Sequence, residues 1–380
     1  MAQDRIGPAQ EIAETPLRRG RKSPARGSRE LYAALDLGTN SCRMLVAEPL
    51  GVQFRIIDAF AKSVRLGTDL ERTGALSDRS IDRTIRALMV CAAKLRKLDV
   101  RHMRLVATEA CRRAANGMDF LAMVRARTGL DLELIAPEEE ARLAVISCAP
   151  LLSADTEQVL VFDIGGGSTE LVWIALDRID PIDRQIAMMQ IDIGLRQGQV
   201  QSLPGAEVVD FVSIPLGVAT LHQRFEDVAN EPARFALMSW FFEEQLAKYR
   251  PYQDHDILVN SGAFQMLGTS GTVPTVAAAP LGLKRYDRRK VDGLTLRADQ
   301  IERVIGRMMD LGREGRSQDP AIGRDRAELI MSGAAILQTL LRIWPTDRLS
   351  VADRGLREGM LMAMMSGQGA LKPEQARHNG

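Results

Sequence analysis

The chain has 380 residues, enough for two or three domains of ordinary size. Its 50 Lys and Arg residues balance 49 Asp and Glu residues, and the net charge of +1 excludes a protein whose overall field attracts nucleic acid. Aromatic residues make up only 4%, too few for the stacking platforms that bind single strands. With four cysteines and four histidines, we expect no disulfide framework or zinc site, and any metal must be held by carboxylates.

Residues 1–29 contain three prolines and no apolar periodicity. Six basic residues between Arg18 and Arg29 predict a disordered basic tail, without the apolar core of a signal peptide. No apolar run reaches the ~18 residues that a membrane span needs. We therefore expect a cytoplasmic protein that does not bind a membrane, and base rates favour a homodimer.

Folded sequence begins at Leu31. Three apolar segments, 31–35, 44–47 and 52–57, predict a meander of strands. A helix with one apolar face follows over about 81–98, because apolar residues recur there every three or four positions. Residues 104–107 return as a strand. Strands followed by helices predict an α/β domain.

The pattern then recurs. An apolar strand over 159–162 ends in Asp163, a glycine turn follows, and residues 170–174 form the next strand. Asp36-Leu-Gly-Thr-Asn-Ser aligns with Asp163-Ile-Gly-Gly-Gly-Ser, 127 positions further on. One glycine turn could arise by chance, but two copies, each after a strand that ends in Asp, predict two related α/β lobes. Their turns are expected to face each other across a cleft.

The rest of the chain has its own expected elements. A strand over 257–259 precedes a loop of small residues, Gly268–Thr272. A helix over 328–341, a strand over 349–352, a turn over 353–355 and a last helix over 356–365 complete the pattern. The methionines of the last helix are expected to fill a core.

The two turns have the composition of phosphate sites. Small residues let backbone N–H groups converge on an anion, and Ser and Thr hydroxyls add donors. Asp36 and Asp163 cannot hold phosphate themselves, but they can hold Mg²⁺, which bridges to phosphate oxygens. The sequence therefore predicts a cleft for a phosphate bound with a metal ion.

Hydrolysis of such a phosphate also needs a positioned water, for which a carboxylate is the usual base. Glu138, Glu139 and Glu140 lie between the two turns in sequence, where the chain crosses between lobes. The alternative is structural, since Glu after Pro137 is favoured at a helix N-terminus. Spacing alone does not decide which of the three glutamates would act. One of the arginines in Thr108–Arg113 could clamp phosphate oxygens, or lie exposed on a helix.

In these motifs the chain resembles the exopolyphosphatase/guanosine pentaphosphate phosphohydrolase (Ppx/GppA) family of the actin–hexokinase–sugar kinase superfamily. The glycine turns are typical of the whole superfamily. The stretches Glu-Glu-Ala-Arg-Leu and Gly-Leu-Arg-Glu-Gly restrict the resemblance to this family. The resemblance covers about residues 31–366, and the matching stretches stand in the family's order: 34–41, 107–114, 139–143, 162–170, 268–272 and 353–359.

The resemblance implies two RNase H-like lobes of the actin-like ATPase type, with an active-site cleft between them. The N-terminal lobe would comprise residues 30–137 and about 356–370, and the C-terminal lobe residues 138–355. Glu140 matches the general base and Arg112 an arginine that faces the cleft. The implied metal residues are Asp163, Glu170 and Asp36. The implied phosphate-binding residues are Gly38, Thr39, Asn40, Ser41, Gly165, Gly166, Gly167, Ser168, Thr169, Gly271 and Thr272.

The implied activity is Mg²⁺-dependent release of terminal orthophosphate from inorganic polyphosphate. Guanosine pentaphosphate is the alternative substrate, and one enzyme could use both. The basic segment 284–290 either guides a long polyanion or is a solvated loop. A kinase or ATPase of the superfamily would bind ATP, against which the Glu-Glu-Ala-Arg-Leu segment argues. A sensor without turnover is disfavoured by the intact Glu140, Asp163 and Glu170.

Overall fold

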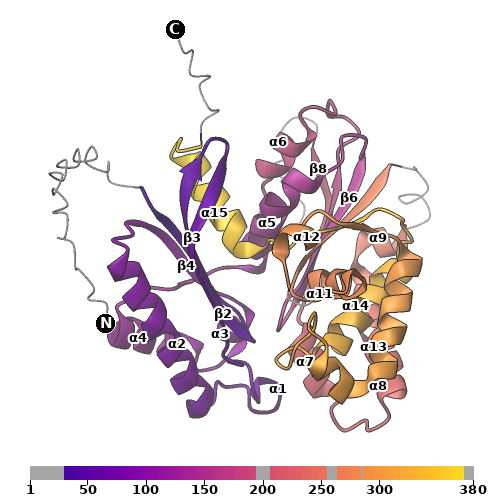
Figure 1. Ribbon diagram of the computed structural model, residues 1–380, viewed down its shortest axis with the longest axis horizontal. Coiled ribbons are helices and arrows are strands. Elements are labelled where there is room, and N and C mark those ends of the chain that lie inside the picture. The colour runs from indigo at the N-terminus through magenta and orange to yellow at the C-terminus, as the bar shows by residue number, and fades with distance from the viewer. Residues whose placement is uncertain (1–29, 194–205, 255–262, 284–285, 372–380) are drawn as a thin grey trace, which may run out of the picture.

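The computed structural model describes residues 30–193, 206–254, 263–283 and 286–371. Figure 1 shows two halves, each built on a sheet, with the N-terminal half in indigo and purple. The expected tail over 1–29 and the expected strand over 257–259 lie outside the described residues.

The first sheet has five strands in the order β3-β2-β1-β4-β5. Side chains of β1 alternate between two cores. Ala33 and Leu35 face α2 and α4, whereas Tyr32 and Ala34 face α15. The elements of this half are β1 Tyr32–Leu37, β2 Ser41–Leu50, β3 Gln53–Ser63, α1 Leu70–Thr73, α2 Asp78–Lys97, β4 His102–Ala107, α3 Glu109–Arg113, α4 Gly117–Thr128 and β5 Glu133–Leu134.

The second sheet has six strands in the order β10-β11-β9-β6-β7-β8. Leu160 and Phe162 of β6 pack on α7, α8, α11, α13 and α14, and Val159 and Val161 pack on α5 and α6. The strands are β6 Gln158–Ile164, β7 Thr169–Ala175, β8 Glu207–Ile214, β9 Phe264–Ser270, β10 Thr295–Leu296 and β11 Leu349–Val351. The helices are α5 Pro137–Cys148, α6 Arg184–Met189, α7 Val218–Arg224, α8 Glu231–Glu244, α9 Arg250–Gln253, α11 Thr272–Ala278, α12 Arg288–Val291, α13 Ala298–Gln318, α14 Ile330–Ile343 and α15 Leu356–Gly367.

The two sheets are copies of one plan. β8-β7-β6-β9-β11 repeats β3-β2-β1-β4-β5 in order, with the same antiparallel and parallel pairs. Even a register shift recurs, between Val46 and Ala47 in β2 and between Trp173 and Ile174 in β7, again 127 positions apart. Bulges bend a strand at a defined place, so this shared shift indicates a shared backbone shape. The expected fold of two RNase H-like lobes is confirmed.

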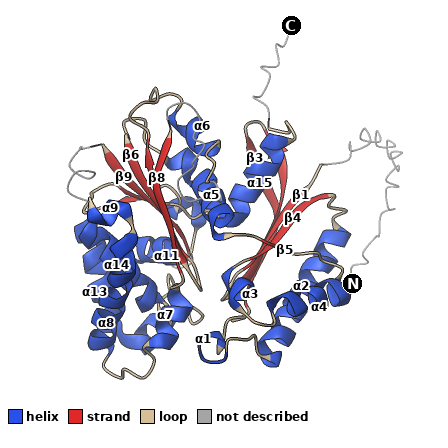
Figure 2. Ribbon diagram, turned by 180° about the vertical axis from the view of Figure 1, so that it is seen from behind, coloured by secondary structure: helices blue, strands red, loops and turns tan. Residues whose placement is uncertain are grey.

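Helices α5 and α15 lie between the sheets, as Figure 2 shows. α15 packs on the first sheet through Met360 and Leu361, and α5 packs on the second through Ala141 and Val145. The two helices touch so closely that a Cβ on Gly359 would lie 2.1 Å from the Leu143 carbonyl oxygen. The residue limits proposed for the two lobes stay a prediction.

One expected loop is wrong. Residues Gly268–Ser270 belong to β9, and only Gly271 separates this strand from α11. β9 is paired on both sides, with β6 and β11, and is buried. A Cβ on Gly268 would lie 2.5 Å from the Phe162 ring, so the small residue serves packing inside the sheet. None of the helices in the described ranges is long and apolar enough to cross a membrane.

Candidate active site

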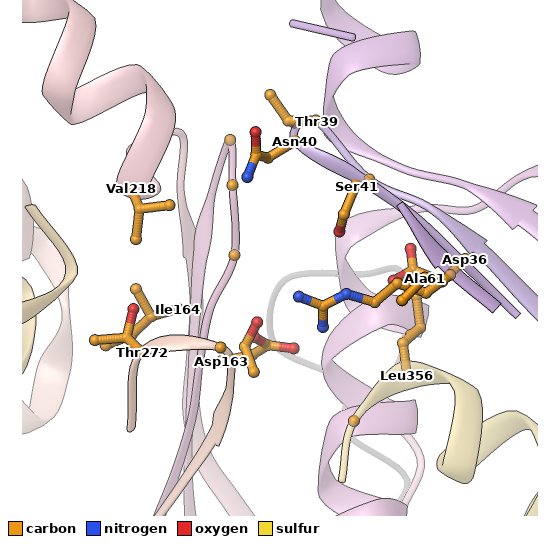
Figure 3. A pocket seen from close by; sticks show the side chains of 18 of the residues that line it. Asp36, Thr39, Asn40, Ser41, Ala61, Asp163, Ile164, Val218, Thr272 and Leu356 are labelled. Carbon is orange, nitrogen blue, oxygen red and sulfur yellow. The ribbon is translucent and has the colours of Figure 1, made fainter. Parts of the chain in front are cut away.

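A cavity of about 630 Å³ lies where the lobes meet, and both supply its wall. Figure 3 shows Asp36 and the turn side chains on one side, with Asp163 and Thr272 on the other. Most of the predicted site residues line it: Asp36, Gly38, Thr39, Asn40, Ser41, Glu140, Asp163, Gly165, Gly166, Gly167, Ser168, Gly271 and Thr272. Arg112, Thr169 and Glu170 lie outside this wall.

The two glycine turns are closed by the same hydrogen bond. Gly38 N–H donates to the Ser41 carbonyl over 3.0 Å, and Gly165 N–H donates to the Ser168 carbonyl over 2.9 Å. Small residues in such turns leave room for an anion beside the backbone. Thr169 does not offer its hydroxyl to the cavity, because that hydroxyl donates to the Leu216 carbonyl over 2.7 Å.

The turns also touch each other across the cavity. A Cβ on Gly167 would lie 2.3 Å from Thr39 Oγ1, and a Cβ on Gly166 would lie 3.0 Å from the Asn40 nitrogen. Glycine is therefore required at these places for the lobes to approach this closely. Thr39 Oγ1 is buried and has no hydrogen-bond partner among the described residues, so it is a donor that a ligand could use.

Glu140 reaches the cavity from the first turn of α5. Both terminal nitrogens of Arg112 donate to Glu140 Oε2 over 3.0 Å. Arg112 also donates to Glu109 Oε2 over 2.9 Å and to the Ile135 carbonyl over 2.8 Å. Burial opposes the charge of Arg112, but the Glu140 and Glu109 carboxylates outweigh it and raise the pKa of this arginine. Arg112 is thus held on three sides and fixes the Glu140 carboxylate.

The structure separates the three glutamates that the sequence left equivalent. Pro137 begins α5, and of the three only Glu140 lines the cavity. Glu139 is bound by Arg104 at 2.6 Å and by Arg142 at 2.6 Å. Burial would raise the pKa of Glu139, but these arginines outweigh burial and lower it. A carboxyl held ionised between two arginines is a weak base, whereas Glu140 stands free at Oε1 within the described part of the chain.

Six acidic residues line the cavity: Asp36, Glu109, Glu140, Asp163, Asp325 and Asp353. The pKa values of Asp36, Glu140 and Asp163, and of Glu170 outside the wall, are all raised. Burial raises the pKa of Asp36, and burial together with Glu170 raises the pKa of Glu140 well above its usual range. Burial also raises the pKa of Asp163 to about 6, against a hydrogen bond from Ser270. Burial and the Asp163 charge raise the pKa of Glu170 to about 7, although Ser213 donates to Glu170 Oε1 over 2.9 Å. Such a cluster favours protonation or a bound cation.

The arrangement fits a cation that is shared with substrate. No group of three or more His, Cys, Asp or Glu side chains among residues 30–193, 206–254, 263–283 and 286–371 is placed to hold a metal ion. Mg²⁺ is nevertheless usually bound by one or two carboxylates together with substrate phosphates and water. Asp163 Oδ1 is buried without a hydrogen-bond partner in these ranges, which leaves a charged oxygen that a cation would satisfy.

Arg43 is a cavity residue that the sequence analysis did not single out. Asp36 pairs with Arg43 across β1 and β2, as Asp163 pairs with Glu170 across β6 and β7. Burial raises the pKa of Asp36 and Asp163, and the charge of Arg43 opposes this rise in both. A residue-by-residue alignment of the two repeats places Arg43 opposite Glu170, and this signal could have found it.

Other cavity residues also escaped the sequence analysis. Arg357 is the second residue of α15 and is half-buried, and the loss of solvent around it lowers its pKa. Ser270, at the end of β9, has a φ of 78°, a strained value for a residue other than glycine. Lys62, Arg326 and Arg354 complete the set of cationic side chains in the wall. Arg354 and Arg357 lie in the family stretch 353–359, which could have found them, whereas nothing in the local sequence of Lys62 and Arg326 distinguishes them from surface residues.

A model of the Ppx/GppA phosphatase family matches residues 45–368. The chain belongs to this family, and so to the phosphohydrolases. The crystal structure of the Aquifex aeolicus Ppx/GppA family member is 29% identical, with a TM-score of 0.67 over 89% of this chain and 98% of that one. The crystal structure of an exopolyphosphatase from Cytophaga hutchinsonii is 20% identical and shares the fold, with a TM-score of 0.72 over 89% and 98% of the two chains.

Proposed function

We propose that this protein is an exopolyphosphatase, which removes terminal orthophosphate from inorganic polyphosphate by Mg²⁺-dependent hydrolysis. One observation carries the proposal: Glu140, fixed by Arg112, reaches a cavity in which two glycine turns meet. The Aquifex aeolicus relative belongs to the same phosphatase family, and the Cytophaga hutchinsonii neighbour is named as an exopolyphosphatase. Both likenesses extend over most of the chain and support this choice.

The residues divide the reaction between them. The two turns bind oxygens of the terminal phosphate through backbone N–H groups and the Thr39 hydroxyl. Glu140 accepts a proton from water, whose oxygen bonds to phosphorus while the bridging P–O bond breaks. The chain leaves one phosphate shorter. Asp163, with Asp36 and Glu170 close by, would hold Mg²⁺, which would supply positive charge beside the phosphate oxygens.

The polar lining of the cavity suits a polyanion. Beside six acidic residues, the wall holds five cationic side chains that can contact phosphate oxygens: Arg43, Lys62, Arg326, Arg354 and Arg357. Of these, Arg354 is also paired with Asp292 at 2.8 Å. The basic segment 284–290 supports the proposal less than expected. Residues 284 and 285 lie outside the described ranges, Arg288 is engaged by Glu358 at 2.7 Å, and Arg289 pairs with Asp287 at 3.2 Å.

Guanosine pentaphosphate is the second candidate substrate, because the family description covers both activities. Its terminal phosphate would undergo the same hydrolysis with a shorter leaving group. We identify no guanine pocket among the cavity residues. Turnover of the two substrates in competition by the purified protein decides between them, and a strong preference for the nucleotide would reverse our order.

The direct test is orthophosphate release from long-chain polyphosphate, with Mg²⁺ and with a chelator. We expect release that continues along the chain when Mg²⁺ is present and stops when it is chelated. Release of equal amount in the chelator would contradict the metal assignment. Phosphate transfer from ATP to an acceptor, without release from polyphosphate, would instead indicate a kinase of the superfamily.

A further inference from the structure

Four arginines form a charged surface at one end of the first lobe. Arg79, Arg83 and Arg86 follow one another on α2 at spacings of four and three, which places them on one face of the helix. Arg65 comes from the loop after β3. Arg65, Arg79 and Arg86 are exposed, and Arg83 is half-buried. We call these four residues the α2 arginine surface.

The charges of this surface are close together and poorly neutralised. Burial lowers the pKa of Arg83, and the charges of Arg79, Arg65 and Arg86 lower it further. Within the described ranges, neither Arg79 nor Arg86 forms an ion pair. The nearby carboxylate of Asp82 is engaged by Arg127 at 3.4 Å. Arg65 has a counterion in Glu328 at 3.6 Å, so the exposed charges without one in the described ranges are those of Arg79 and Arg86. Exposed charges without counterions attract an external polyanion.

Arg83 fixes the geometry of the surface. Its guanidinium donates to the Arg65 carbonyl over 2.8 Å and also to the Val64 carbonyl. The backbone at Arg65 has a φ of 45°, so this bend is held by a side chain of α2 rather than by glycine. Helix and loop are thereby tied into one unit, and the exposed arginines on either side keep a defined spacing.

The surface continues from the cavity. Lys62 at the end of β3 is exposed and also lines the cavity, so the cavity opens there. Arg65 follows three residues later, and its guanidinium lies 3.6 Å from Glu328 of the other lobe. Figure 1 shows α1 between α2 and α7. Cationic side chains therefore lead from the cavity onto α2.

We propose that the α2 arginine surface binds the distal part of a polyphosphate chain whose terminal phosphate is in the cavity. The proposal rests on the proposed function and names the part of the protein that favours long chains. From Arg79 to Arg86 the surface extends ~10 Å along α2, at ~1.5 Å per residue, beyond Arg65 and Lys62. The proposal therefore requires that long chains contact Arg79 and Arg86 and that tripolyphosphate, bound in the cavity, does not.

The test compares long-chain polyphosphate with tripolyphosphate. The variant Arg79→Gln/Arg86→Gln removes two exposed charges and keeps Arg83, which holds the loop. The control Arg96→Gln/Lys97→Gln removes two exposed charges from the opposite end of the same helix. Equilibrium binding of each polyanion is measured over a series of KCl concentrations, and kcat/KM is measured for both in parallel.

We expect the first variant to bind long-chain polyphosphate about tenfold more weakly than the control, with the salt slope reduced by about 0.7 for each lost contact. The ratio of kcat/KM for long chains to that for tripolyphosphate falls by a similar factor. Equal binding by variant and control, or an equal loss for both polyanions, overturns the proposal. If the wild type binds long chains through these arginines but releases no phosphate, the surface stands and the proposed activity fails. If phosphate is released and the ratio of kcat/KM values does not change, the proposed activity stands and the α2 arginine surface is not the binding site.

Discussion

At the scale of single residues, the proposed reaction depends on how Glu140 is held. Burial and the charge of Glu170 make Glu140 a stronger base than a free carboxylate, whereas Arg112 stabilises its ionised form. Arg112 does so without taking both oxygens, because its hydrogen bonds to this residue all go to Oε2. One carboxylate oxygen is thereby oriented by the arginine, and the other can accept a proton from water.

We expect Glu140→Gln to lower kcat by about 10³-fold, in the range measured for loss of a general base. The amide keeps the size of the side chain, so polyphosphate should still bind. Glu139→Gln is the matched control: it lies one residue away, is held by Arg104 and Arg142, and does not line the cavity. Phosphate release and equilibrium binding by both variants check this. Near-normal turnover by Glu140→Gln would mean that another group is the base.

Arg112→Lys tests the arginine fork. Lysine keeps the charge but cannot bridge Glu140, Glu109 and the Ile135 carbonyl, so we expect kcat to fall about 10- to 100-fold. Arg113→Lys is the control on the same short helix. The Arg113 side chain pairs with Glu71 at 2.6 Å, and neither residue lines the cavity. A similar loss of kcat in both variants would show that disruption of α3, rather than the fork, is responsible.

At the scale of elements, the site depends on two strand–turn–strand units that close on each other. Neither turn has a positive φ among its glycines, so the requirement for glycine comes from the partner turn rather than from the local backbone. Gly167 contacts Thr39, and also Glu109, where a Cβ would lie 3.1 Å from Glu109 Cγ. The second turn therefore packs directly on the residue that holds Arg112.

Gly167→Ala should hinder this closure without strain in its own backbone. The added Cβ would lie 2.3 Å from Thr39 Oγ1, so we expect KM for polyphosphate to rise about tenfold. Thr39→Ala removes the clashing oxygen. Adding Gly167→Ala to Thr39→Ala should therefore raise KM less than Gly167→Ala raises it in the wild type. Gly306→Ala within α13, where a Cβ meets open space, is the control and should raise stability by about 0.5–1 kcal/mol. Unchanged KM in Gly167→Ala would indicate that the turns need not touch.

The sequence predicted the elements well where a local pattern decides the structure. The helix expected over about 81–98 is α2, which spans Asp78–Lys97, and the repeat of Asp36 at Asp163 predicted both lobes. The prediction was wrong at Gly268, because small residues are typical of a loop but here belong to a strand that packs against Phe162. It also missed Arg43, which resembles any strand arginine until the second lobe brings Asp163 beside it. These failures concern contacts between distant segments, which local patterns do not report.

At the scale of the whole molecule, the fold brings four carboxylates from both lobes together, of which Glu170 is buried and the other three are half-buried. Asp36 comes from the first sheet, Asp163 and Glu170 from the second, and Glu140 from the helix between them. Burial is the largest cause that raises the pKa of Glu140, and repulsion from Glu170, Asp36 and Asp163 raises it further. The charge of Arg112 lowers it. The closed arrangement therefore stores unfavourable charge, which a divalent cation at Asp163 would relieve.

This repulsion predicts how the stability of the metal-free protein changes with pH. The pKa of Asp163 rises from 3.8 to about 6 on folding, and that of Glu170 from 4.5 to about 7. The folded protein thus binds more protons between these limits, and its stability is highest below them and falls as pH rises through about 6 to 7.

In a chelator, we expect the Tm to fall by roughly 3–6 °C between pH 5 and pH 8. Asp163→Asn/Glu170→Gln should reduce this fall and leave the part due to Glu140, whose pKa is also raised, whereas Glu226→Gln, which changes an exposed carboxylate, should not. Mg²⁺ should raise the Tm more at pH 8 than at pH 5, because it binds the ionised carboxylates. Thermal unfolding of the wild type and both variants measures these differences, and a wild-type Tm that rises from pH 5 to pH 8 in chelator would contradict the buried-charge account.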